Sequence, residues 1–134
     1  YSRVAYVEVL PDQCGTTTAA FLRRTVRWFA ARGVSIERVL TDNGSAYVSK
    51  VFQAAGCRAH LKLRRTRPYR PQTNGKAERF IQTRLREWAY AVPYPHSWRR
   101  TRALRPWLRS YNTVRQHSAL DYQPPSTRFP RAAQ

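Results

Sequence analysis

Residues 36–45 read Ile36-Glu37-Arg38-Val39-Leu40-Thr41-Asp42-Asn43-Gly44-Ser45, so an apolar, β-branched run leads into an aspartate and a tight turn. The run predicts a strand over residues 37–40, and Asp42 follows its carboxyl end. An Asp-Asn-Gly sequence is also a common turn former. Considered alone, Asp42 is therefore compatible with two interpretations, a turn residue and a cation ligand.

A second stretch carries another carboxylate, and it reads Pro71-Gln72-Thr73-Asn74-Gly75-Lys76-Ala77-Glu78-Arg79. Glu78 lies in the first turns of a predicted amphipathic helix, where an acid also complements the helix dipole. The chain has seven acids against 25 lysines and arginines, so an acid at a basic surface is costly unless it holds a cation. Two carboxylates suit Mg²⁺, which leaves its other positions to water and phosphate oxygens.

Thirty-five residues lie between Asp42 and Glu78. The two stretches and this spacing resemble the catalytic core of DDE-type, retroviral-integrase-like insertion-sequence transposases, a group named for two aspartates and a glutamate on an RNase H-like fold. The resemblance covers nearly the whole chain and continues into a closing segment, Tyr111-Asn112-Thr113-Val114-Arg115-Gln116-His117-Ser118-Ala119-Leu120, followed by Tyr122 and Pro124-Pro125.

The resemblance implies that Asp42 and Glu78 are the second and third of three carboxylates that hold two Mg²⁺ or Mn²⁺ ions. These ions activate the attacking water or DNA 3′-hydroxyl and stabilise the leaving oxygen. The first carboxylate has no counterpart, because Asp12 would lie in a turn and Glu8 in the wrong strand. We therefore expect an N-terminally truncated core that lacks the first strands of its sheet and is inactive by itself.

The remaining apolar pattern predicts alternating strands and helices, an order typical of an α/β fold. We expect strands over residues 4–10 and 58–63, helices over 16–30, 45–56 and 98–111, and an extended tail after residue 116. The organisation that follows is a partial RNase H-like catalytic core over residues 1–95, with residues 96–134 as the C-terminal helix and basic tail of the same domain. Trp28, Trp88 and Trp107 fall at core spacing, and Trp98 is left open.

The net charge of +18 indicates a polyanionic partner, most often nucleic acid. The candidate DNA contacts are polar or basic residues near the two carboxylates: Asn43, Arg64, Arg65, Arg67, Arg70, Gln72, Thr73, Asn74, Lys76 and Arg79. A second basic stripe comprises Arg99, Arg100, Arg102, Arg105 and Arg109. For any single residue of these sets, a solvated surface or ordinary loop and cap chemistry is an equal alternative.

Three functions compete. The first is DNA transposition or integration, with this chain as a fragment of a transposase that acts on transposon ends and target DNA as a homo-oligomer. The second is a non-catalytic basic DNA-binding module, and the third is a ribosomal type of RNA-binding protein, which has no use for the two carboxylates at this spacing. The two cysteines without a disulfide framework, and the lack of a signal peptide or membrane-spanning run, favour a cytoplasmic setting. The resemblance implies a bacterial cell, with nucleoid association when the protein is bound to DNA.

Overall fold

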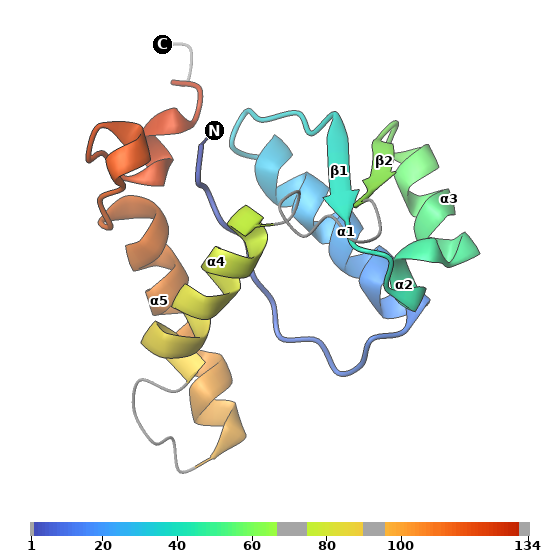
Figure 1. The fold of residues 1–134 in the computed structure, drawn as a ribbon, viewed down its shortest axis with the longest axis horizontal. Coiled ribbons are helices and arrows are strands. Elements are labelled where there is room, and N and C mark those ends of the chain that lie inside the picture. The colour runs from blue at the N-terminus through green and yellow to red at the C-terminus, as the bar shows by residue number, and fades with distance from the viewer. Residues whose placement is uncertain (1, 67–74, 90–95, 132–134) are drawn as a thin grey trace. The chain divides into compact units, whose positions relative to one another are not determined.

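The computed structural model describes residues 2–66, 75–89 and 96–131, which belong to two compact units (Figure 1). The sheet unit consists of Leu10–Ala77, and the helical unit consists of Tyr1–Val9 together with Glu78–Gln134. The division into residues 1–95 and 96–134 stays a prediction. No helix in the described part of the chain is long and apolar enough to cross a membrane.

The sheet unit combines two parallel strands with helices. Its elements are α1 (Gly15–Ala30), β1 (Arg38–Thr41), α2 (Ser45–Val48), α3 (Lys50–Arg58) and β2 (Lys62–Arg65). The register pairs Arg38 with Lys62 and Thr41 with Arg65, so both strands end at the same edge. The predicted first helix and the strand before Asp42 are confirmed. Gly33 adopts a φ of 77° just beyond α1, where a glycine ends the helix without steric cost.

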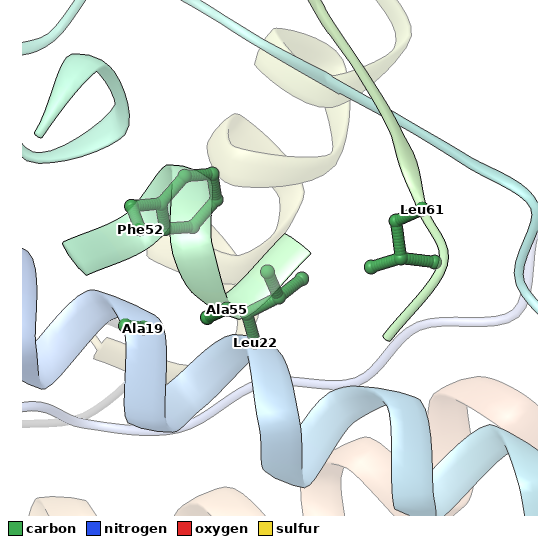
Figure 2. Close-up of a cluster of buried hydrophobic side chains, with 5 residues drawn as sticks. All are labelled: Ala19, Leu22, Phe52, Ala55 and Leu61. Carbon is green, nitrogen blue, oxygen red and sulfur yellow. The ribbon is translucent and has the colours of Figure 1, made fainter. Parts of the chain in front are cut away.

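The core of the sheet unit lies between α1, α3 and the chain entering β2 (Figure 2). Its buried side chains are Ala19 and Leu22 from α1, Phe52 and Ala55 from α3, and Leu61. In each helix the two residues lie three apart, so they occupy one face and meet the opposite helix. This packing holds the two strands against the helices.

Two predicted boundaries in this unit are wrong. The helix expected over residues 45–56 is interrupted at Ser49, whose extended backbone caps α3 and whose Oγ accepts a hydrogen bond from Phe52 N–H at 3.2 Å. Helix α3 continues past Gly56 to Arg58, so the strand expected over 58–63 begins only at Lys62. A Cβ at position 56 would lie 2.5 Å from Leu63 Cδ1, so the glycine inside α3 lets the Leu63 side chain of β2 approach the helix.

The helical unit contains the second part of the fold. Its elements are α4 (Gly75–Arg84) from Glu78 onward, which continues into the π-helical turn η2 (Leu85–Ala89), then α5 (Ser97–Thr113), η3 (Ser118–Leu120) and η4 (Pro125–Arg128). Trp88 and Leu104 form its buried centre, and Trp107 packs against them. The prediction of core positions for Trp88 and Trp107 is confirmed, whereas Trp98 is 55% exposed.

The tail after residue 116 is not extended, as we expected, but folds back on itself. His117 and Gln123 form an antiparallel bridge, with the short helix η3 between these two residues and η4 just after Gln123. Leu120 and Pro125 are the largest fully buried side chains described. The burial of these two apolar side chains stabilises the folded tail. The local sequence pattern does not reveal this burial.

Residues 4–10 do not form the predicted strand, because no strand of the described chain pairs with them. The side chain of Asn112 instead takes the place of a neighbouring strand. Ala5 N–H donates to Asn112 Oδ1 at 2.9 Å, and Asn112 Nδ2 donates to the Ala5 carbonyl at 2.8 Å. Both residues are buried, so this pair of hydrogen bonds attaches the N-terminal segment to α5.

Replacing Asn112 should destabilise the helical unit. Asn112→Ala leaves the N–H and the carbonyl of Ala5 buried and unpaired, so we expect the free energy of unfolding to fall by about 2 to 4 kcal/mol. Urea denaturation followed by circular dichroism measures this change. The matched control is Gln116→Ala, which removes an amide side chain three residues after the end of α5. Equal effects of the two substitutions would contradict the role assigned to Asn112.

A polar cluster around His117 lies in the same unit. The rings of Tyr111 and His117 meet edge to face with centroids 5.1 Å apart, and Arg115 pairs with Glu87. Burial lowers the pKa of His117 below its ordinary value, and the positive charges of Arg115 and Arg3 lower it further. Within the described residues, His117 Nε2 is buried without a hydrogen-bond partner, in keeping with a neutral ring.

Acid should therefore weaken this unit. The unfolded chain binds the proton of His117 near the ordinary histidine pKa of about 6.5, whereas the folded chain binds it only at lower pH. We expect the free energy of unfolding to fall as the pH drops below about 6.5. The fall ends once the pH is below the pKa of His117 in the folded chain. His117→Gln should make this dependence shallower. The control is His60→Asn, which replaces an exposed histidine at a φ of 57° with asparagine, a residue that tolerates this backbone conformation. This control should leave the pH dependence of stability unchanged. Parallel pH profiles for wild type and His117→Gln would refute this assignment.

Candidate active site

Asp42 lies directly after β1, at the edge where both parallel strands end. Its Oδ1 accepts a hydrogen bond from Gly44 N–H at 2.8 Å, and Thr41 Oγ1 donates to the Asp42 carbonyl at 3.0 Å. The residue is exposed, and Oδ2 makes no hydrogen bond to any residue that the structure describes. One carboxylate oxygen of Asp42 therefore shapes the turn, and the interpretation of Asp42 as a cation ligand stays a prediction.

Asn43 fixes the loop that carries Asp42. Its Nδ2 donates to the Thr66 carbonyl at 3.0 Å, and Thr66 N–H donates to the Thr41 carbonyl at 2.8 Å. The loop after β1 is thereby attached to the end of β2. The structure gives Asn43 a positioning role, and a contact of Asn43 with DNA stays a prediction.

A cavity of about 270 Å³ opens at the same end of the strands. It is lined by apolar and polar side chains in equal number: Val48, Phe52, Leu63, Thr41, Gln53 and Arg65. Arg65 was predicted as a phosphate contact, whereas Thr41 and Gln53 were not predicted. No signal in the sequence marks them, because the cavity is assembled from residues 41 to 65 only after β1 and β2 pair.

Tyr47 is a further residue of this site that the sequence analysis missed. Its ring meets Phe52 edge to face with centroids 5.3 Å apart. Burial raises the pKa of the Tyr47 hydroxyl, and the negative charge of Asp42 raises it further. The phenol therefore stays protonated at neutral pH and can donate a hydrogen bond beside the carboxylate.

Glu78 is the fourth residue of α4, in the first turns of a helix as predicted. Its side chain lies outside what the structure describes, and Asp42 and Glu78 belong to different compact units. Their joint binding of a cation stays a prediction. Among the described residues, no group of three acidic, histidine or cysteine side chains forms a metal centre.

The predicted DNA contacts are described only in part. Arg64 and Arg65 are exposed on β2, and Arg79 is exposed on α4. Lys76 belongs to α4, and its side chain is not among those that the structure describes. The remaining predicted contacts lie outside the described residues: Arg67, Arg70, Gln72, Thr73 and Asn74.

Two family models, both described as integrase core domain, match the chain over residues 1–71 and residues 59–125. The chain belongs to the integrase core domain family.

Curated relatives come from bacterial insertion elements. An uncharacterised protein of insertion element IS136 from Agrobacterium fabrum is 30% identical over 99 residues, which make up 74% of this chain and 51% of that protein. The transposase InsD of insertion element IS2D from Escherichia coli is 33% identical over 86 residues, or 64% of this chain and 29% of that protein. The chain thus spans about half the length, or less, of these relatives.

Solved structures share the fold. The catalytic core domain of BIV integrase superposes with a TM-score of 0.71 at 18% identity, covering 96% of this chain and 78% of that chain. One chain in the structure of the simian T-cell lymphotropic virus intasome superposes with a TM-score of 0.66 at 22% identity. This match covers 90% of this chain and 42% of that chain. The predicted fold class is therefore confirmed as an incomplete RNase H-like integrase core, and the described residues form two parallel strands of it.

Two substitutions of Asp42 separate its turn role from its charge. Asp42→Ala removes the acceptor for Gly44 N–H, so we expect the free energy of unfolding to fall by about 0.5 to 1.5 kcal/mol. Asp42→Asn keeps an acceptor oxygen in the same position, so it should cost less than about 0.5 kcal/mol. Thermal or urea denaturation compares the two variants. A larger loss for Asp42→Asn than for Asp42→Ala would contradict the turn assignment.

Proposed function

We propose that this chain is part of a transposase that cuts and joins DNA by metal-dependent phosphoryl transfer, with Asp42 and Glu78 as two of its catalytic carboxylates. The observation that carries the proposal is the position of Asp42 at the carboxyl end of β1, with Oδ2 available, in a chain of the integrase core domain family. The family relatives from insertion elements support DNA transposition as the process.

The residues at hand fit a hard divalent cation such as Mg²⁺ or Mn²⁺. Asp42 is exposed and has one carboxylate oxygen unused within the described part of the chain, and carboxylate oxygen is the ligand that these ions prefer. A pair of bound ions would activate the attacking hydroxyl and stabilise the leaving oxygen. Asp42 and Glu78 hold the ions in this proposal, and Asn43 keeps the Asp42 loop in place through Thr66.

DNA is the proposed partner, both as transposon ends and as target. Exposed Arg64, Arg65 and Arg79 bind phosphates, together with Arg67, Arg70 and Lys76. Gln72, Thr73 and Asn74 contact the DNA backbone or its water near the carboxylates. Phosphate contacts position the duplex and carry little sequence information. The intact protein acts as a homo-oligomer in this proposal, in a bacterial cell and associated with the nucleoid.

A non-catalytic DNA-binding module is the second candidate for these 134 residues. Two observations favour it: the net charge of +18, and the presence of two family carboxylates where the pattern has three. Both candidates predict DNA binding, and they differ in whether the chain transfers phosphoryl groups.

The 134-residue chain should bind DNA without joining it. If six to ten phosphates are contacted, affinity for a duplex falls by roughly 10³ to 10⁵ between 50 and 200 mM salt. Fluorescence anisotropy measures this binding, and a labelled DNA end incubated with target DNA and Mg²⁺ or Mn²⁺ measures joining. We expect no joined product, because two carboxylates do not complete the three-carboxylate site.

Metal binding tests the roles of the two carboxylates directly. Calorimetric titration with Mn²⁺ should give a saturable signal that weakens in Asp42→Asn and in Glu78→Gln. The matched control is Glu37→Gln, which removes an exposed acid just before β1 and should leave the titration unchanged. In the joining experiment, a joined product that disappears in Glu78→Gln would contradict the expected inactivity of this chain. In the anisotropy experiment, DNA binding that does not depend on salt would contradict the proposed DNA partner.

A further inference from the structure

Helix α5 has two faces of opposite character. Leu104 is buried, and Ala103 and Trp107 pack with it against Trp88. On the other side, four exposed residues follow one line at positions i, i+4, i+7 and i+11, and we call this line the α5 stripe: Trp98, Arg102, Arg105 and Arg109. Spacings of three and four residues keep them on one face of the helix.

The charge of the stripe is not compensated within its helix. The 17 residues of α5, Ser97–Thr113, contain no aspartate or glutamate. At 1.5 Å per residue, the 11 steps from Trp98 to Arg109 extend over roughly 16 Å, which matches the axial length of about five nucleotides of one DNA strand. Within this length, the three guanidinium groups from Arg102 to Arg109 form a row over seven steps, or roughly 10 Å.

An exposed aromatic stack stands at the amino-terminal end of this row. The rings of His96 and Trp98 are stacked with centroids 6.2 Å apart and an interplanar angle of 8°. The Arg99 guanidinium carbon lies 5.3 Å from the centre of the Trp98 ring. Trp98 is 55% exposed, which is unusual for the largest apolar side chain when no partner covers it. Basic tracks that end in exposed aromatic rings are typical of surfaces that bind unpaired nucleic acid strands.

We propose that the α5 stripe binds a DNA strand with an unpaired end, with Arg102, Arg105 and Arg109 on its phosphates and an unpaired base extending the His96–Trp98 stack. This inference rests on the proposed DNA partner and adds a second binding surface, on a helix that carries neither Asp42 nor Glu78. The arginines attract duplex and single strand alike, whereas the aromatic stack selects for an unpaired base.

The aromatic part is tested with two DNA ligands, a blunt duplex and the same duplex carrying a five-nucleotide single-stranded extension. Trp98→Ala should weaken binding of the extended ligand about 5- to 100-fold and that of the blunt ligand less than about 2-fold, since loss of one stacked base has effects of this size. Trp98→Phe keeps a ring and should recover most of the affinity. Equal losses on both ligands, or no loss on either, would overturn the proposal.

The basic part is tested by the salt dependence of binding to the extended ligand. The triple variant R102Q/R105Q/R109Q should reduce the slope of log affinity against log salt by about 2 to 3, because each phosphate that an arginine neutralises accounts for about 0.7 to 0.9 of that slope. The matched control is R23Q/R27Q/R58Q, which removes the same charge from exposed positions of α1 and α3 and should change the slope by less than about 1.

The two tests separate this inference from the proposed function. Wild-type binding of the blunt duplex with a steep salt slope, together with an unchanged slope in the stripe variant, overturns the α5 stripe and leaves the DNA partner standing. Wild-type binding that does not respond to salt overturns the DNA partner and the stripe together. Circular dichroism spectra that match the wild type establish that each variant is folded.

Discussion

The parallel pairing of β1 with β2 determines where the carboxylate of Asp42 can lie. Two short strands are marginal by themselves in water, so their pairing depends on the helices that cover them. Ala19 and Leu22 of α1 meet Phe52 and Ala55 of α3, and this contact supplies the apolar burial that the strands lack. The loop of Asp42, the cavity beside it and the Asn43 attachment all exist because the two strands end together.

The helical unit also contains a backbone segment that needs hydrogen-bond partners, and a side chain provides them in place of a strand. Its N-terminal segment has the alternating composition of a strand and no strand beside it in the described chain. The amide of Asn112 provides one donor and one acceptor, which is what a neighbouring backbone offers at one residue. The closing segment that contains Asn112, Arg115 and His117 thus has a structural task, because it binds the N-terminal segment and Glu87 to the end of α5.

The sequence predicts those features that local chemistry decides. The strand before Asp42 follows from its β-branched run, the end of α1 from Gly33, and the helix through Glu78 from its apolar spacing. The predictions fail where a distant contact decides, as at Gly56, which Leu63 covers, and in the tail, where Leu120 and Pro125 are buried. Likewise the position of Asp42 after a strand is predicted from the chain alone, whereas Tyr47 and the cavity depend on residues that only the folded sheet unit brings together.

The two faces of α5 also bear on how such a protein can change over generations. Residues that pack against Trp88 are constrained by the fold, since an altered volume there leaves a cavity or a clash. The three arginines of the α5 stripe have no such constraint, because surface substitutions away from packed contacts alter stability by about 0.5 kcal/mol or less. Selection can therefore tune the attraction of this helix for a polyanion in single steps, up or down, while the same helix continues to hold the unit together.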